Sequence, residues 1–279
     1  MPIDREALSK AKHNLFYIEN VESEIFRVME VDKFFDLLET GNLSLTAPKL
    51  WDDPYENFLK YSYGISARKN VRTSYEYYSQ LIFGQCWTLN QETDQIWRVY
   101  SPNRDRVKIR TTIKKLHNSV KNIQDELFIS YLGGVKYLSE SEVKKRIVET
   151  IKKSEILYDL AFYPDKLIRE HYLIKRDTFQ YENEIRLMVK LPTPPENYRN
   201  AIYQDPSNLD ICNLTLNDPI DLIDEVVFDP RMSESIVEAY TFFLRNSLGF
   251  LKPVYKSNLY RKPEIKVKIR SDADSKEGG

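Results

Sequence analysis

The stretch from Phe179 to Val189 constrains the fold of this 279-residue chain more than any other segment. Apolar and polar residues alternate along it. Side chains of a strand point alternately to its two faces, so this pattern predicts a β-strand with one buried face. The expected buried face consists of Phe179, Tyr181, Ile185, Leu187 and Val189, and the opposite face consists of Gln180, Glu182, Glu184 and Arg186.

The polar face of this expected strand has two interpretations. Glu182 and Glu184 would project side by side, within reach of Arg186, and neighbouring charges of both signs can tune the pKa of a catalytic carboxylate. A charged face is also typical of a solvated edge strand, where it prevents pairing with other sheets. The strand alone favours the second interpretation, because amphipathic strands are common. The acid pair therefore needs support from other segments.

Composition and residue spacing exclude several classes of protein. The 41 Lys and Arg balance the 42 Asp and Glu, so there is no overall positive field for nucleic acid, although the basic runs 69–78 and 104–115 are candidate local contacts. No glycine-rich phosphate loop is present. Cys86 and Cys212 are isolated, and the three histidines lack metal-ligand spacing, so we expect no metal. With no long apolar run, we expect a soluble cytoplasmic protein without membrane contact.

The order of expected elements indicates an α+β fold in one domain covering residues 1–270. A helical insertion is expected at about 138–172, a loop at 192–219 with a candidate strand from Leu209 to Leu216, and a disordered polar tail at 271–279. A compact helix is expected from Val31, with Gly41 at its C-terminal end. The expected core includes Phe26, Leu37, Leu38, Leu45, Trp87, Ile185, Leu187 and Val227.

Several short motifs follow one another along the chain. They are the basic strand Phe26-Arg27-Val28, the helix Leu37-Leu38-x-x-Gly41, the turn Asp53-Pro54-Tyr55-Glu56, the pair Cys86-Trp87-Thr88 and Ile96-Trp97-x-x-Tyr100, and the strand Tyr181-Glu182-x-Glu184-x-Arg186. In this order they resemble a widespread bacterial family of unknown function, from residue 26 to about residue 230. The chain departs from that family at Trp87-Thr88, where the family has Phe-Ser, and lacks its His before Tyr100.

A more distant resemblance is to the ADP-ribosyltransferase fold, a mixed sheet core to which this chain would add the helical insertion. Arg27 matches the basic residue of that fold's first strand, and Ser44 or Thr46 matches the hydroxyl residue of its second strand. Glu184 matches the catalytic glutamate of a later strand, with Glu182 as the first acid of Glu-x-Glu.

This resemblance implies an enzyme that uses NAD as a substrate and transfers ADP-ribose to a macromolecule, either nucleic acid (RNA or DNA) or protein. Cleavage of the nicotinamide–ribose bond builds positive charge on the sugar, which a fixed carboxylate such as Glu184 stabilises. Glu182 would activate the acceptor, and Arg27 would bind the diphosphate or the adenosine ribose. Ser44 or Thr46 would position the ribose, and Trp97 or Tyr100 would stack on nicotinamide. A toxin or antiviral-defence role, with an antitoxin or chaperone as partner, follows from the same resemblance.

Two other functions remain open from the residues alone. Asp53, Glu56, Glu182 and Glu184 could cluster around Mg²⁺ in a nuclease, although Arg186 stands where such enzymes place a lysine. Alternatively, the acidic strand could recognise a basic partner surface without catalysis, as in a neutralising protein. Consumption of NAD, compared with degradation of nucleic acid, separates these functions.

Overall fold

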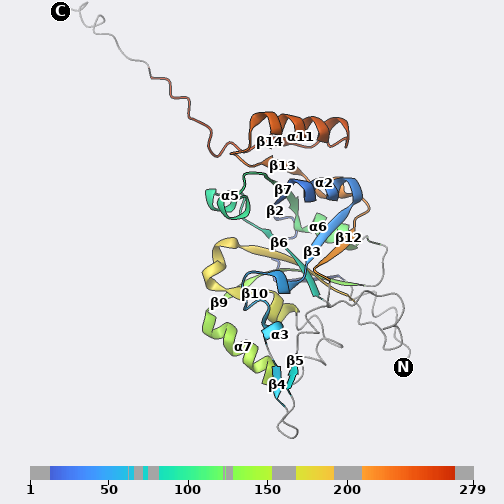
Figure 1. Ribbon diagram of the computed structural model, residues 1–279, viewed down its shortest axis with the longest axis vertical. Coiled ribbons are helices and arrows are strands. Elements are labelled where there is room, and N and C mark those ends of the chain that lie inside the picture. Colours follow the sequence, from blue (N-terminus) through green and yellow to red (C-terminus); the bar gives the residue numbers. More distant parts are fainter. Residues whose placement is uncertain are drawn as a thin grey trace, which may run out of the picture.

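The computed structural model describes residues 13–61, 63–65, 72–74, 82–121, 123, 128–152, 168–191 and 209–267. These residues form one large mixed sheet with flanking helices, so the expected mixture of α and β structure is confirmed (Figure 1). The strands are β1 (His13–Phe16), β2 (Glu24–Glu30), β3 (Asn42–Thr46), β4 (Tyr63–Ile65), β5 (Arg72–Ser74), β6 (Ile82–Thr88), β7 (Arg106–Thr112), β8 (Ile129–Gly134), β9 (Lys136–Leu138), β10 (Ile174–Arg176), β11 (Glu184–Lys190), β12 (Ile211–Thr215), β13 (Glu225–Phe228) and β14 (Val254–Lys256).

Helices and short helical turns lie between some of these strands along the chain. The α-helices are α2 (Val31–Thr40), α3 (Phe58–Tyr61), α5 (Asp94–Tyr100), α6 (Ile113–Lys121), α7 (Glu140–Lys152), α10 (Pro219–Leu222) and α11 (Glu234–Asn246). Shorter turns of helix are η1 (Pro48–Leu50), η2 (Ile168–Tyr172, of π type) and η3 (Asp177–Glu182, of 3₁₀ type). Helix α2 ends as expected: Gly41 adopts a left-handed conformation with φ of 78° and donates its N–H to Leu37 O.

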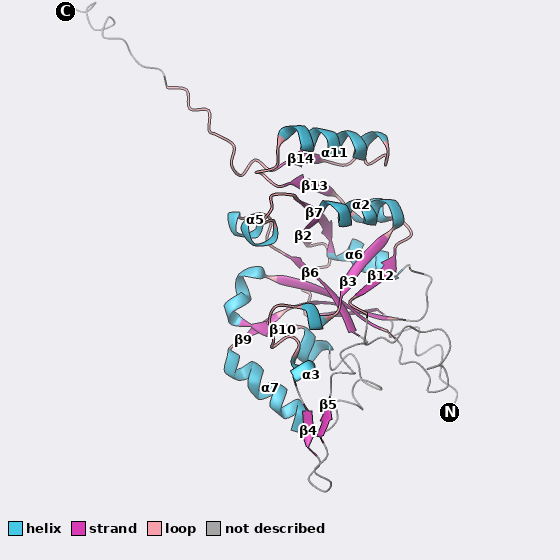
Figure 2. Ribbon diagram, viewed as in Figure 1, coloured by secondary structure: helices cyan, strands magenta, loops and turns pink. Residues whose placement is uncertain are grey.

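The main sheet has the strand order β1-β8-β11-β6-β2-β7-β13-β14, and the pair β3–β12 joins it at β6 (Figure 2). Most neighbours are antiparallel, whereas β1–β8 and β13–β14 are parallel. β6 and β11 pair over seven residues, but β2 meets β6 at a single position, Phe26 opposite Thr88. The sheet therefore opens between β2 and β6, and residues of both strands line a cavity there.

Apolar side chains on the two faces of β11 belong to two separate clusters. Ile185, Leu187 and Val189 pack into the main core, to which α2, α6 and α11 also contribute. Met188 points to the opposite face and packs with Tyr172 and other residues of a smaller cluster. All eight residues expected in the core are buried, which confirms that part of the sequence analysis.

The structure corrects the expected strand at 179–189. The chain from Asp177 to Glu182 is a 3₁₀ helix, Asn183 adopts a left-handed conformation, and β11 begins only at Glu184. The polar face of β11 is also not solvated. All seven residues of the strand are buried, and segments around Glu56 and Lys175 cover the face that carries Glu184 and Arg186.

The structure describes only part of the segments expected to form the insertion, the loop and the tail. The expected insertion at 138–172 begins with the helix α7 and ends with the η2 turn, and residues 153–167 lie outside the described part. The expected tail at 271–279 and residues 192–208 of the expected loop also lie outside it, and the described end of that loop contains the strand β12 and the start of α10. Among the described residues no helix is long and apolar enough to cross a membrane.

Candidate active site

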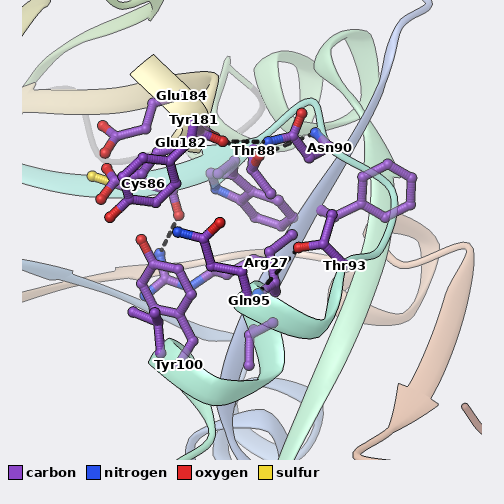
Figure 3. A pocket seen from close by; sticks show the side chains of 15 residues that line it. Arg27, Cys86, Thr88, Asn90, Thr93, Gln95, Tyr100, Tyr181, Glu182 and Glu184 are labelled. Carbon is purple, nitrogen blue, oxygen red and sulfur yellow. Dashed lines mark hydrogen bonds between the residues drawn. The ribbon is translucent and has the colours of Figure 1, made fainter. Parts of the chain in front are cut away.

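A cavity of about 270 Å³ lies where the sheet opens between β2 and β6. It is lined by residues from β2, β6, the loop before α5, α5 itself and the segment that leads into β11. Figure 3 shows the two carboxylates, Glu182 and Glu184, near one another and Tyr100 of α5 below them. Aromatic and apolar side chains with a few converging charged groups are typical of a small-molecule site.

Arg27 brings a guanidinium group from β2 to this cavity. Its Nη1 atom donates to the backbone oxygen of Cys86 at 3.3 Å, and its buried Nε atom has no hydrogen-bond partner in the described part of the chain. Within the described residues, Arg27 has no carboxylate partner. Burial lowers the pKa of Arg27 to about 10, so the group remains cationic at neutral pH. A partly buried cation with an unused donor is suited to bind an anionic ligand.

The carboxylates of Glu182 and Glu184 converge on one ammonium group. Lys175 of β10 lies 2.8 Å from Glu184 Oε1 and also binds Glu182 Oε2. The second oxygen of Glu184 accepts from Arg186 Nε at 2.6 Å. Glu184 is therefore held on both oxygens by cations, whereas one oxygen of Glu182 is bound to a cation.

Arg186 is the inner member of this charged cluster and is completely buried. It donates to Glu184, to Glu56 and, at 2.9 Å, to the backbone oxygen of Tyr172. Its guanidinium group also lies 4.8 Å from the centre of the Trp51 ring. Each of the three nitrogens of the group thus donates to a defined partner, which offsets the cost of burying the charge.

The two acids have opposite shifts in pKa. Burial raises the pKa of Glu182 to about 7, and its hydrogen bond with Glu184 acts in the same direction, against the charge of Lys175. Burial also acts to raise the pKa of Glu184, but the charges of Arg186 and Lys175 outweigh it and hold that pKa below its usual value. Near pH 7 the pair therefore consists of one ionised acid and one acid close to its midpoint.

The structure brings together several of the residues that the sequence analysis singled out. Arg27, Tyr100, Glu182 and Glu184 all line the same cavity. Glu56 and Arg186 lie behind it in the charged cluster. These positions are compatible with the expected roles, which remain proposals.

Ser44 and Thr46 do not line this cavity. Ser44 Oγ donates to Asn213 Oδ1 of β12 at 2.7 Å, and the Thr46 hydroxyl accepts from Trp51 Nε1 at 3.3 Å. Both residues are on β3, which meets β6 at Gly84 rather than at its cavity end. Their placement therefore gives no support to a role in binding NAD at this cavity.

Trp97 and Asp53 are also not among the residues that line the cavity. Trp97 is completely buried and donates from Nε1 to Glu92 at 2.6 Å, so the α5 aromatic residue that lines the cavity is Tyr100. Asp53 binds Arg176 through both oxygens, at 3.0 and 3.1 Å. The two side chains have structural partners instead of cavity contacts.

Sequence reasoning missed Lys175 and Tyr137. Lys175 bridges the acid pair, and the Tyr137 hydroxyl accepts the backbone N–H of Glu184 at 2.9 Å. The available signal for Lys175 was its place directly after the apolar run Leu173-Ile174, where a buried lysine requires an acidic partner. Tyr137 had no comparable signal.

The described residues contain no group of three or more ligating side chains arranged to hold a metal ion. In the charged cluster, oxygens of Glu56, Glu182 and Glu184 already bind Lys175 and Arg186. A divalent cation at these oxygens would have to approach two buried positive charges, which opposes its binding.

Comparison with known proteins found no match among curated proteins. Solved structures similar to this chain include the DarT protein of Thermus sp. 2.9 in complex with ADP-ribosylated single-stranded DNA, with 11% sequence identity, a TM-score of 0.37, and coverage of 86% of this chain and 95% of that chain. The same DarT protein in complex with NAD⁺ has 11% identity, a TM-score of 0.36, and coverage of 86% and 96%. Residues 96–187 match the model of the family described as "Protein of unknown function (DUF2971)", which confirms the resemblance to a family of unknown function.

Proposed function

We propose that this protein is an NAD-dependent ADP-ribosyltransferase that modifies a macromolecular acceptor, either nucleic acid or protein. The observation that carries the proposal is found in one cavity, where an arginine with no acidic partner among the described residues lies near two acids with opposite pKa shifts. The diphosphate of NAD is an anion that the arginine can bind, and the bond between nicotinamide and ribose is a glycosidic bond that a pair of acids can cleave.

In this proposal Arg27 binds the diphosphate of NAD. Its Nε atom is buried and has no hydrogen-bond partner among the described residues, so a phosphate oxygen there would satisfy a donor that otherwise carries a cost in free energy. The planar guanidinium group can donate two parallel hydrogen bonds to phosphate oxygens. This interaction involves the unreacting part of NAD, so it contributes to binding more than to the chemical step.

Glu184 is the proposed electrostatic catalyst. Its charge is maintained at neutral pH and its position is fixed by Arg186 and Lys175, so no rearrangement is needed when positive charge develops on the ribose. The bond from ribose C1′ to the nicotinamide nitrogen breaks, and nicotinamide leaves as a neutral molecule with the bonding electron pair. Glu184 then stabilises the positive charge left on the sugar.

Glu182 is the proposed general base for the acceptor. A nucleophilic oxygen or nitrogen of the acceptor forms the new bond to C1′, and its proton passes to the ionised carboxylate of Glu182. A pKa of about 7 suits this role, since such a group is available as a base and still accepts a proton readily. Tyr100, at the side of the cavity, offers a ring on which nicotinamide can stack.

The test is release of nicotinamide from NAD by the purified protein, with and without a chelator, and with DNA, RNA or protein as acceptor. We expect NAD consumption that survives the chelator. Arg27→Ala should raise KM for NAD at least ten-fold, whereas Arg106→Ala, which changes a surface arginine of β7, should leave it unchanged. Degradation of nucleic acid without NAD, only in the presence of Mg²⁺, would refute the proposal in favour of a nuclease. Absence of both activities would favour a binding protein.

The biological setting is proposed on the sequence resemblance alone. An enzyme of this kind in the cytoplasm would act as a toxin or in antiviral defence, and its activity would require control by an antitoxin or a chaperone. Expression of the wild-type protein should then arrest bacterial growth, and Glu184→Gln should relieve the arrest. Equal toxicity of both proteins would contradict this setting.

A further inference from the structure

Lys175 occupies the centre of the charged cluster behind the cavity. Its Nζ atom lies 2.8 Å from Glu184 Oε1 and 3.8 Å from Glu56 Oε2, and it binds Glu182 Oε2. The side chain is only 9% exposed. It is the cation that contacts both acids of the cavity, because the hydrogen bonds of Arg186 go to Glu184, Glu56 and a backbone oxygen.

The two-stranded sheet β9–β10 fixes the position of Lys175. In its parallel register Lys175 lies opposite Tyr137. The Tyr137 hydroxyl accepts the backbone N–H of Glu184 at 2.9 Å, and Glu184 O accepts the backbone N–H of Val135 at 3.0 Å. Tyr137 and Val135 therefore hold the backbone of Glu184, and Lys175 on the neighbouring strand holds its carboxylate.

An aromatic ring limits where the ammonium group can move. The Phe179 ring centre lies 4.7 Å from Lys175 Nζ, at a distance that permits a cation–π interaction. Phe179 belongs to η3, the 3₁₀ helix that ends at Glu182. The same short helix thus supplies both the ring and one of the two carboxylates that confine the ammonium group.

The two acids of the cavity are bound by different numbers of cations. Glu184 is bound by two cations, Arg186 and Lys175, whereas Glu182 is bound by Lys175. Three carboxylates face two cations in the cluster, which leaves one negative charge in excess when all are ionised. Among the described residues, the titratable groups that face Glu182 are Lys175 on β10, Glu184 on β11, Tyr137 on β9, Tyr100 on α5 and its neighbour Tyr181 on η3.

We propose that Lys175 is a positioning residue that holds both acids toward the cavity and lets the carboxyl of Glu182 give up its proton at a lower pH than it would without the ammonium group. This inference rests on the proposed function for its catalytic meaning. Without the ammonium group, Glu184 keeps Arg186 as its partner, but Glu182 loses its cation. Glu182 then becomes a weaker acid and remains protonated at pH values where the wild-type residue is ionised.

The deciding measurement is a ¹³C NMR titration of glutamate-labelled protein without NAD, with the Glu182 signal assigned from Glu182→Gln. In Lys175→Met we expect the midpoint of Glu182 to rise by about one pH unit or more. Lys144→Met, which removes a lysine of α7 that binds the exposed Glu140, should leave the midpoint at its wild-type value. A smaller rise in Lys175→Met, or an equal rise in Lys144→Met, would overturn the inference.

A second measurement links the titration to activity. With a midpoint near pH 8 instead of about 7, the ionised fraction of Glu182 at pH 7 falls about five-fold, and acceptor modification should fall by the same factor. Above pH 8 the rate of acceptor modification by Lys175→Met should return toward the wild-type rate, and KM for NAD should be the same in both proteins. A loss that is equal at every pH would indicate a merely structural role and overturn the inference.

The two measurements separate the inference from the proposed function. If no variant consumes NAD, the proposed function fails, but the NMR titration still decides the role of Lys175. If Lys175→Met does not fold, the titration is done on Lys175→Met combined with Glu56→Gln, which removes one positive and one negative charge together. The rise for Glu182 is then measured against Glu56→Gln alone, and a rise of less than about one pH unit relative to that variant overturns the inference.

Discussion

Replacement of Glu184 by Gln tests the proposed catalyst with the smallest change in shape. The amide can still accept a hydrogen bond from Arg186 Nε, now 2.6 Å from Oε2, but the negative charge is lost. If that charge stabilises the developing positive charge on ribose, its removal raises the barrier of the chemical step. Binding of NAD should change little, because the charge acts mainly in the transition state.

The charges of the cluster set the expected magnitudes. Loss of one preorganised electrostatic contact costs about 10²- to 10³-fold in turnover. Because two cations partly neutralise Glu184, we expect about 10²-fold for Glu184→Gln. The free energy of unfolding should decrease by about 1–3 kcal/mol, less than for an isolated buried pair, because two carboxylates then balance two cations.

The assay is single-turnover release of nicotinamide, with equilibrium binding of NAD and urea unfolding measured on the same preparations. Glu234→Gln serves as the control, because it changes an exposed glutamate of α11 that binds Lys256. The control should match the wild type in all three measurements. Less than a ten-fold loss of turnover in folded Glu184→Gln would refute the catalytic role of this charge.

Three other perturbations have defined outcomes. Acceptor modification should increase from pH 6 to pH 8, because Glu182 must be ionised to act as a base and its pKa is about 7; Glu182→Gln should abolish this increase in a pH–rate profile. Arg27→Lys keeps a positive charge but loses the planar fork, so calorimetry should show weaker NAD binding by about ten-fold. Gly84→Ala should decrease the free energy of unfolding by about 1–3 kcal/mol in urea, because its Cβ would lie 2.7 Å from both Met188 Sδ and Trp51 Cζ2.

Burial was the most predictable property of this chain. Apolar residues at regular spacing identified core positions on several strands and on α2, and Gly41 marked the end of that helix. Periodicity reports burial directly, because each period brings the same face of an element toward the core. Placement of Arg27 on a strand was predictable for the same reason, since apolar neighbours surround it in sequence.

The segments that cover the polar face of β11 could not be predicted from the pattern of residues along that strand. Glu182, Glu184 and Arg186 alternate like a solvated strand face, yet Glu56, 130 residues before Arg186, binds that arginine in the interior. A local segment of sequence carries no information on which distant segment covers it. The same limit explains why Ser44 and Thr46, ordinary strand residues in pattern, were expected at a cavity that they do not line.

The turn at Asn183 explains how two neighbouring acids meet one ammonium group. Asn183 has φ of 45° and ψ of 58°, a left-handed conformation that asparagine adopts more readily than most residues, and it separates η3 from β11. In a continuous strand, Glu182 and Glu184 would project in parallel, about 6–7 Å apart along the chain. The turn instead lets both carboxylates bind Lys175, so a break in the expected strand, and not its alternation, produces the acid pair.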